Sequence, residues 1–334
     1  MNTHVELSFE KPIFTTYHNY AASGFALSKH PEGNHAFINH CTDLRCDRTF
    51  LRGYTSPNID CPGASLHNIN YFYRRIVCNI YAERILREVI YQMLDEGMYV
   101  YFGGVDDYYI PGKSWYGIRH MMHDGIIIGY DDTDKTYTIA AYDINWIFRP
   151  FKIPQESFSE AVKSGVENKA NFCSIVGLEL KAERIHLETN ATPERLKQYL
   201  RSDLVQYPPE KNGKVTGIVV HDYIAMYMEM LHNGKIPYEK MDWRVMRLIW
   251  EFRNCMHQRL IAIENSLKLG NICSEQYKEI LERTNHLRML YALYSKKKKD
   301  SIPLLIRDEL LVLKDAEKEI LKQFIQMKED KVPT

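Results

Sequence analysis

A histidine and an aspartate near the middle of the chain have the residue types and the placement of a catalytic base and the acid that orients it. His123 precedes the apolar segment 126–130, and Asp143 ends the next apolar segment, 137–143. If the two segments form a hairpin, the end of the second strand lies beside the start of the first. A carboxylate that holds one ring nitrogen leaves the other free to take a proton from a nucleophile. The pattern predicts this role for His123, with Asp143 as its partner.

Helices and strands on both sides of this hairpin would have to position the pair. Segment 98–102 is apolar and predicts a buried strand, and 172–180 alternates like another strand. A helix is predicted over 79–96, where apolar residues recur at helical spacing before Gly97, a residue that favours helix ends. Further helices are predicted over 62–77, after Asp60 and Pro62, and over 154–164. This mixture predicts an α+β fold for the first part of the chain.

The second part of the chain is predicted to be almost entirely helical. Helical patterns cover 192–205, 217–232, 242–269, 274–295 and 301–328. A chain of 334 residues is long enough for two domains. We therefore predict one domain over 1–185 and a helical bundle domain over 186–334.

Composition excludes several classes of partner and compartment. Basic and acidic residues balance at 43 each, which argues against a general nucleic-acid or membrane surface. No apolar run approaches membrane-spanning length, and the first residues lack the form of a signal peptide. The seven cysteines are scattered and odd in number, without a C-x-x-C pair. These features predict a reduced, cytoplasmic protein without structural disulfides.

Several short stretches in two parts of the chain are similar to a known family. In the first part they are 97–102, 106–111, 120–124 and 129–131, and in the second 216–218, 242–244 and 258–260. By these stretches the first part resembles the N-terminal domain of the butirosin-biosynthesis acyltransferases, which are papain-like, protease-derived proteins that occur beside nonribosomal peptide assembly lines. The second part resembles the helical tail of the peptide-synthetase-associated branch of that family.

The resemblance implies a papain-like domain of the cysteine-protease type, followed by an all-helical C-terminal domain. It also implies an enzyme that forms amide bonds in thiotemplated natural-product biosynthesis, without a metal or other cofactor. A cysteine would take an acyl group from the phosphopantetheine thioester of a carrier protein and pass it to a small amine. Two alternatives are an inactive papain-like module that binds a carrier protein or a peptide, and a cysteine peptidase.

The residue that matches the family's nucleophile is not a cysteine. The family has an active-site cysteine at the start of a helix near the N-terminus, and Ala21 stands at the matching place. Either the cysteine has been replaced here, in a variant or an inactive relative, or another cysteine acts. The candidates for that second case are Cys41, Cys46 and Cys61. The side chain of Asn19, or backbone N–H groups after Tyr20, would hold the oxyanion.

Three further patterns have alternative interpretations. His120, His123 and Asp124 would suit a metal on a helix, but the strand that begins at 126 leaves little room for that helix, so no metal site is predicted. The acidic and aromatic run 106–109 either lines a substrate cleft or packs in the core. The four lysines of 296–299 form either a solvated loop or a docking patch for an acidic carrier protein.

Overall fold

The computed structural model describes residues 2–66, 68, 71–78, 83–168, 173–181, 183, 185–202, 213–299 and 301–331. The chain divides into two compact units. Unit 1 contains residues 1–34 and 69–185, and unit 2 contains residues 35–68 and 186–334. The sequence predicts a boundary at 185/186, where the units also divide, but it places 35–68 in the first domain, whereas this segment belongs to unit 2.

Unit 1 contains an antiparallel seven-stranded sheet in the order β4-β9-β5-β6-β7-β8, with β1 pairing on β6. The bounds of these strands are β1 His4–Glu6, β4 Phe72–Cys78, β5 Tyr99–Asp106, β6 Met122–Asp131, β7 Thr136–Tyr142, β8 Phe148–Pro154 and β9 Ser174–Leu180. Strand β6 is central because β5 pairs with its first half and β1 with its second half. The α+β class predicted from the sequence is confirmed.

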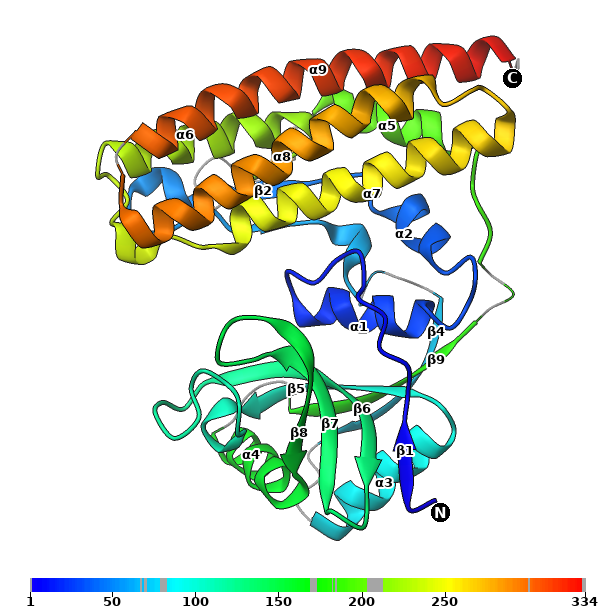
Figure 1. Ribbon diagram of the computed structural model, residues 1–334, viewed down its shortest axis with the longest axis vertical. Helices are drawn as coiled ribbons and strands as arrows, with labels where there is room; N and C mark the ends of the chain where they lie inside the picture. The colour runs from blue at the N-terminus through cyan, green and yellow to red at the C-terminus, as the bar shows by residue number, and fades with distance from the viewer. Residues whose placement is uncertain are drawn as a thin grey trace. The chain divides into compact units, whose positions relative to one another are not determined.

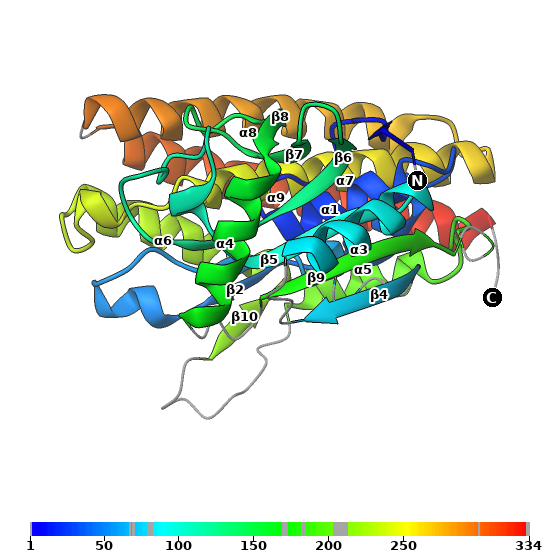
Figure 2. The same cartoon turned by 90° about the horizontal axis from the view of Figure 1, so that it is seen from below.

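Helices cover both faces of this sheet. Figures 1 and 2 show α3 (Glu83–Asp95) and α4 (Gln155–Glu167) on one face, and α1 (His18–Leu27) on the other. The first face holds a continuous apolar core that includes Ile90, Val100, Ile127 and Phe158. Helix α4 approaches β5 closely, since a Cβ atom on Gly165 would lie 2.0 Å from the carbonyl oxygen of Gly104. This approach places the neighbouring Ser164 against the end of β5.

Unit 2 is a helical bundle with a small sheet. Its helices are α2 Asn34–His40, α5 Thr192–Arg201, α6 Val220–His232, α7 Arg244–Leu267, α8 Ile272–Lys297 and α9 Ser301–Lys331. Helices α7 and α8 pack together, and α9 packs against both α8 and α6, as Figure 1 shows. The predicted helical pattern of 192–328 is thus confirmed for the described residues. The sheet has the order β10-β2-β3, formed by Lys214–Thr216, Arg45–Asp47 and Ile59–Asp60. These pairings join the segment 35–68 to unit 2.

A network of buried polar groups connects the helices of unit 2. Glu317 of α9 has a fully buried side chain that accepts two hydrogen bonds from Arg253 of α7, at 3.0 and 2.9 Å. Tyr277 of α8 and Tyr199 of α5 donate to its other oxygen, at 2.6 and 3.3 Å. Because burial of an ionised pair requires such partners, the network fixes how these four helices pack.

The predicted helix over 62–77 is wrong. Only a short 3-10 turn forms at Pro62–Ala64, and Phe72–Cys78 is strand β4. Pairing of all seven β4 residues with β9 stabilises this strand, and its aromatic and β-branched residues suit it. A helical start signal at Pro62 is therefore overridden by a strand pairing that involves residues about 100 positions away.

Candidate active site

His123 is held by an aspartate, but the aspartate is Asp107. The Nδ1 atom of His123 lies 2.5 Å from Oδ2 of Asp107, which follows strand β5 directly. The strands bring the two together, because His123 pairs with Val105 of β5. The carboxylate of Asp107 is buried, while the His123 side chain is 36% exposed. In the neutral ring that donates Nδ1–H to Asp107, Nε2 is the proton acceptor.

The prediction that Asp143 orients His123 is wrong. Pairing of β6 with β7 begins only at Ile126, so it does not extend to His123. Asp143 instead accepts hydrogen bonds from the backbone N–H groups of Asn145 and Ile147, and from Arg149 at 2.6 Å. Burial acts to raise the pKa of Asp143, but these donors outweigh it and the pKa lies below the ordinary value. Asp143 thus stabilises the loop after β7.

A buried lysine accompanies the Asp107–His123 pair. The Nζ atom of Lys113 lies 3.5 Å from Oδ1 of Asp107, and both side chains are almost fully buried. An ionised carboxylate in such a place requires compensation, and the lysine and histidine supply it from two sides. The sequence pointed to Asp107 only as part of the run 106–109, as cleft lining or core, and it did not point to Lys113. The usable signal was the pair Asp106-Asp107 at the end of a buried strand, where acids are uncommon.

A second histidine connects α1 to the same region of the sheet. His18, the first residue of α1, lies 3.0 Å from Asp124, and Tyr101 donates to the other oxygen of that carboxylate at 2.8 Å. The other ring nitrogen of His18 accepts the N–H of Tyr142 at 3.3 Å. Burial lowers the pKa of His18 more than Asp124 raises it, so its ring is neutral near pH 7. Both ring nitrogens are occupied, so His18 has a structural role.

Asp124 should make unit 1 sensitive to acid. Burial acts to raise its pKa, but His18 and Tyr101 outweigh it and the pKa is about 2. A depressed folded-state pKa stabilises the fold above the unfolded value of 3.8, and this contribution is lost as the pH falls from about 4 to about 2. In the unaltered chain, Asp124 should account for about 2 kcal/mol of the fall in unfolding free energy between pH 5 and pH 2. We expect Asp124→Asn to remove this part of the fall. Asp134→Asn, in an exposed turn of the same sheet, is the control, and equal pH dependence in both variants would contradict the assignment.

A second aspartate–histidine pair lies next to the first. His120 Nδ1 lies 2.7 Å from Asp106, whose fully buried carboxylate also accepts the hydroxyl of Ser164 at 2.7 Å. The backbone N–H groups of Tyr108 and Met121 donate to its other oxygen, each at 3.1 Å. Burial alone would raise the pKa of Asp106, but these donors bring it below the ordinary value. Asp106 therefore fixes the chain on either side of the site.

Ala21 lies on α1, on the same helix face as His18 because the two are three residues apart. Its side chain is fully buried and has no nucleophilic atom. The N–H of Ala21, the first after Tyr20, donates to the carbonyl of Tyr17 at 3.1 Å, so it is not placed to hold an oxyanion. Asn19, at the second position of the helix, is half-buried, and its backbone carbonyl accepts a hydrogen bond from the hydroxyl of Ser23.

The alternative cysteine nucleophiles are in a different unit from His123. Cys41, Cys46 and Cys61 all belong to unit 2, and all three are fully buried. Burial raises the pKa of the Cys41 thiol well above its ordinary value, and it raises the pKa of Cys46 as well. A reactive cysteine needs the opposite environment, accessible and favourable to the thiolate.

Two loops beside the histidine pairs expose apolar side chains. The loop 110–121 and the loop 143–147 are joined by a hydrogen bond from Ile144 N–H to Gly112 and by one from the Ser114 hydroxyl to Asp143. Large apolar residues on these loops are at least half exposed, namely Tyr116, Ile118, Ile144, Trp146 and Ile147. Clusters of this kind commonly mark binding surfaces.

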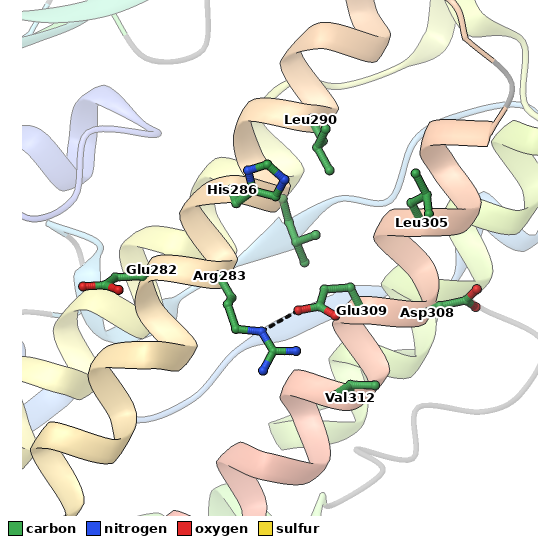
Figure 3. A pocket seen from close by; sticks show the side chains of 9 residues that line it. Glu282, Arg283, His286, Leu290, Leu305, Asp308, Glu309 and Val312 are labelled. Carbon is green, nitrogen blue, oxygen red and sulfur yellow. Dashed lines mark hydrogen bonds and ion pairs between the residues drawn. The ribbon is translucent and has the colours of Figure 1, made fainter.

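Unit 2 has a groove of about 630 Å³ between α8 and α9. Figure 3 shows Arg283 and Glu309 pointing toward one another across it, joined at 2.7 Å, while Glu282 and Asp308 point away. The remaining lining is mainly apolar. The described residues of this groove therefore lack a carboxylate–histidine pair like that of unit 1.

Lys298, from the predicted lysine patch, lies 4.2 Å from the centre of the Tyr238 ring.

Neither a metal centre nor a membrane segment is found among the described residues. No three histidine, cysteine or acidic side chains converge there as metal ligands, and His120 and His123 each contact a different aspartate. None of the described helices combines the length and the apolar character needed to cross a bilayer.

No protein-family model matches this chain, and no curated protein matches it either.

Proposed function

We propose that unit 1 is a papain-like acyltransferase domain in which His123, oriented by Asp107, acts as a general base in amide formation. The observation that carries this proposal is the 2.5 Å contact between a buried carboxylate and an accessible histidine. The acyl donor would be a thioester on the phosphopantetheine arm of a carrier protein, and the acceptor a small amine. The resemblance suggests the substrate class, and the contact between His123 and Asp107 supports the choice of base.

The residues of this chain favour direct transfer over an acyl-enzyme. Position 21 has no nucleophilic atom, and the thiols of Cys41, Cys46 and Cys61 are buried in unit 2. In direct transfer the amine nitrogen attacks the thioester carbonyl carbon, while its proton passes to Nε2 of His123. The C–S bond then breaks, and the leaving thiolate takes the proton back from the imidazolium ring. The products are an amide and a free thiol, and His123 returns to its starting state.

Exposed apolar side chains beside the site support an acyl substrate. The loops that carry Ile118, Ile144 and Trp146 would cover an acyl chain and exclude water from the thioester. Water exclusion matters because hydrolysis of the thioester competes with attack by the amine.

The second candidate function is a papain-like module that binds a carrier protein or a peptide without catalysis. Ala21 favours it, because the family's reaction begins with a cysteine at this place. The two functions make different demands on His123. Direct transfer requires His123 to accept a proton, whereas binding without catalysis does not.

Intact-mass spectrometry after mixing the chain with an acylated carrier protein tests the route. Without an amine, we expect no acyl mass on the chain as it stands. Addition of 1,4-diaminobutane should then release the thiol and form the amide. Ala21→Cys tests whether position 21 is the family's nucleophile site, because a gain of the acyl mass by this variant alone would assign it. Acylation of the unaltered chain would contradict direct transfer.

A further inference from the structure

A pocket in unit 1 lies beside the second aspartate–histidine pair, His120 and Asp106. It has a volume of about 360 Å³ and extends from the 3-10 turn Asp107–Tyr109 to helix α4. Three tyrosines line it, Tyr108, Tyr109 and Tyr116, and so do Glu156 and Glu160. None of the described residues that line it carries a positive charge.

The aromatic wall of this pocket is held in place by its surroundings. The rings of Tyr108 and Tyr109 lie edge to face, with centroids 5.1 Å apart. The His120 ring stacks on Tyr108 at 4.4 Å, and the buried Asp106 holds both the His120 ring and the N–H of Tyr108. The N–H of Gly117 donates to the carbonyl of Tyr108, which ties the following loop to the same wall. The second aspartate–histidine pair thus holds the aromatic wall of the pocket in place.

The two glutamates share one face of α4, because they are four residues apart. Both are exposed, and neither forms an ion pair with a described residue. Like charges at this spacing destabilise a helix unless a cation lies between them. Aromatic rings attract organic cations through their faces, and this attraction adds to that of the carboxylates.

We infer that this pocket binds an organic cation, an alkylammonium group on an apolar stem. Tyr108 directly follows Asp107, the residue that holds His123, so the lining of the pocket begins one residue along the chain from the partner of the proposed base. The role of this cation as the acyl acceptor rests on the proposed function, whereas its binding does not. A diamine would place one ammonium group against Glu156 and Glu160 and leave its other amine for the thioester.

Isothermal titration calorimetry of the full chain with 1,4-diaminobutane tests the pocket without any acyl donor. We expect binding of the diamine and at least tenfold weaker binding of 1,4-butanediol, its neutral match. Glu156→Gln and Glu160→Gln should each weaken diamine binding about threefold, and the double variant about tenfold. Tyr109→Leu should weaken it about threefold. The control is Glu167→Gln, at the last residue of the same helix and outside the pocket, where affinity should not change.

Three results would overturn the inference: no binding of the diamine, equal binding of the diol, or full affinity in the double glutamine variant. Its failure is distinguishable from failure of the proposed function. His123→Ala should bind the diamine with unchanged affinity. Selective binding by a chain without transfer activity would therefore support the pocket and contradict the proposed function. Transfer activity without selective diamine binding would support His123 as the base and contradict the inference that the pocket binds an organic cation.

Discussion

Replacement of His123 by alanine is expected to lower the rate of amide formation about 10²- to 10⁴-fold, the usual contribution of a general base. The reason is that the attacking amine loses its proton acceptor, while Lys113 remains as a partner of the buried Asp107 carboxylate. The rate is measured as thiol release from an acyl-pantetheine thioester in the presence of 1,4-diaminobutane. Added imidazole should restore part of the rate, which a purely structural role would not allow.

The control for this variant lies on the same sheet. His4 of β1 contacts Asp131, at the opposite end of β6, with a distance of 3.5 Å. His4→Ala also removes a histidine–aspartate contact, but this one is exposed and outside the site, so the rate should not change. Equal rates for His123→Ala and His4→Ala would show that His123 is not the base.

Glu317→Ala is expected to destabilise unit 2 by about 3–5 kcal/mol, the usual cost of breaking a buried ion pair from one side. The variant leaves the guanidinium group of Arg253 fully buried without its carboxylate, and it removes the acceptor of Tyr277. Thr284 would remain the only described side chain bonded to that guanidinium. Scanning calorimetry and urea unfolding measure the loss, followed through the transition of unit 2.

The matched control for Glu317 lies two residues further along the same helix. Glu319 forms an exposed contact with Lys322 at 2.8 Å, and Glu319→Ala should leave the unfolding transition unchanged. A loss for Glu317→Ala below about 1 kcal/mol would contradict the network as the element that fixes the helix packing.

Regular periodic segments were predictable because local pattern and final structure agree in them. The long helices α7, α8 and α9 follow from apolar residues at helical spacing, and strands β6 and β7 from short apolar runs around a polar turn. Strand β4 was not predictable in this way, because its stability depends on its pairing with β9. The segment 35–68 also joins unit 2 through distant pairings, such as Cys46 with Val215.

The position of His123 was predictable from the sequence, but its hydrogen-bond partner was not. His123 was expected at the head of a strand, and it lies there as the second residue of β6. The alternation of side chains between the two faces of a strand favoured Asp143 as the partner. That prediction required β7 to pair with β6 as far as His123. The neighbour at that point is instead the end of β5, where a 3-10 turn redirects the chain and brings Asp107 to the ring. Strand order determines this contact, and a single sequence does not reveal it.

The most direct test of the account is whether the unaltered chain forms amides from thioesters. Acetyl, hexanoyl and benzoyl thioesters of pantetheine would each be mixed with 1,4-diaminobutane, and amide product, free thiol and intact protein mass followed in one sample. The account predicts repeated turnover above the uncatalysed rate, loss of that turnover in His123→Ala, and no acyl mass on the protein. Amide formation at the uncatalysed rate by the folded chain would contradict it and favour the binding module.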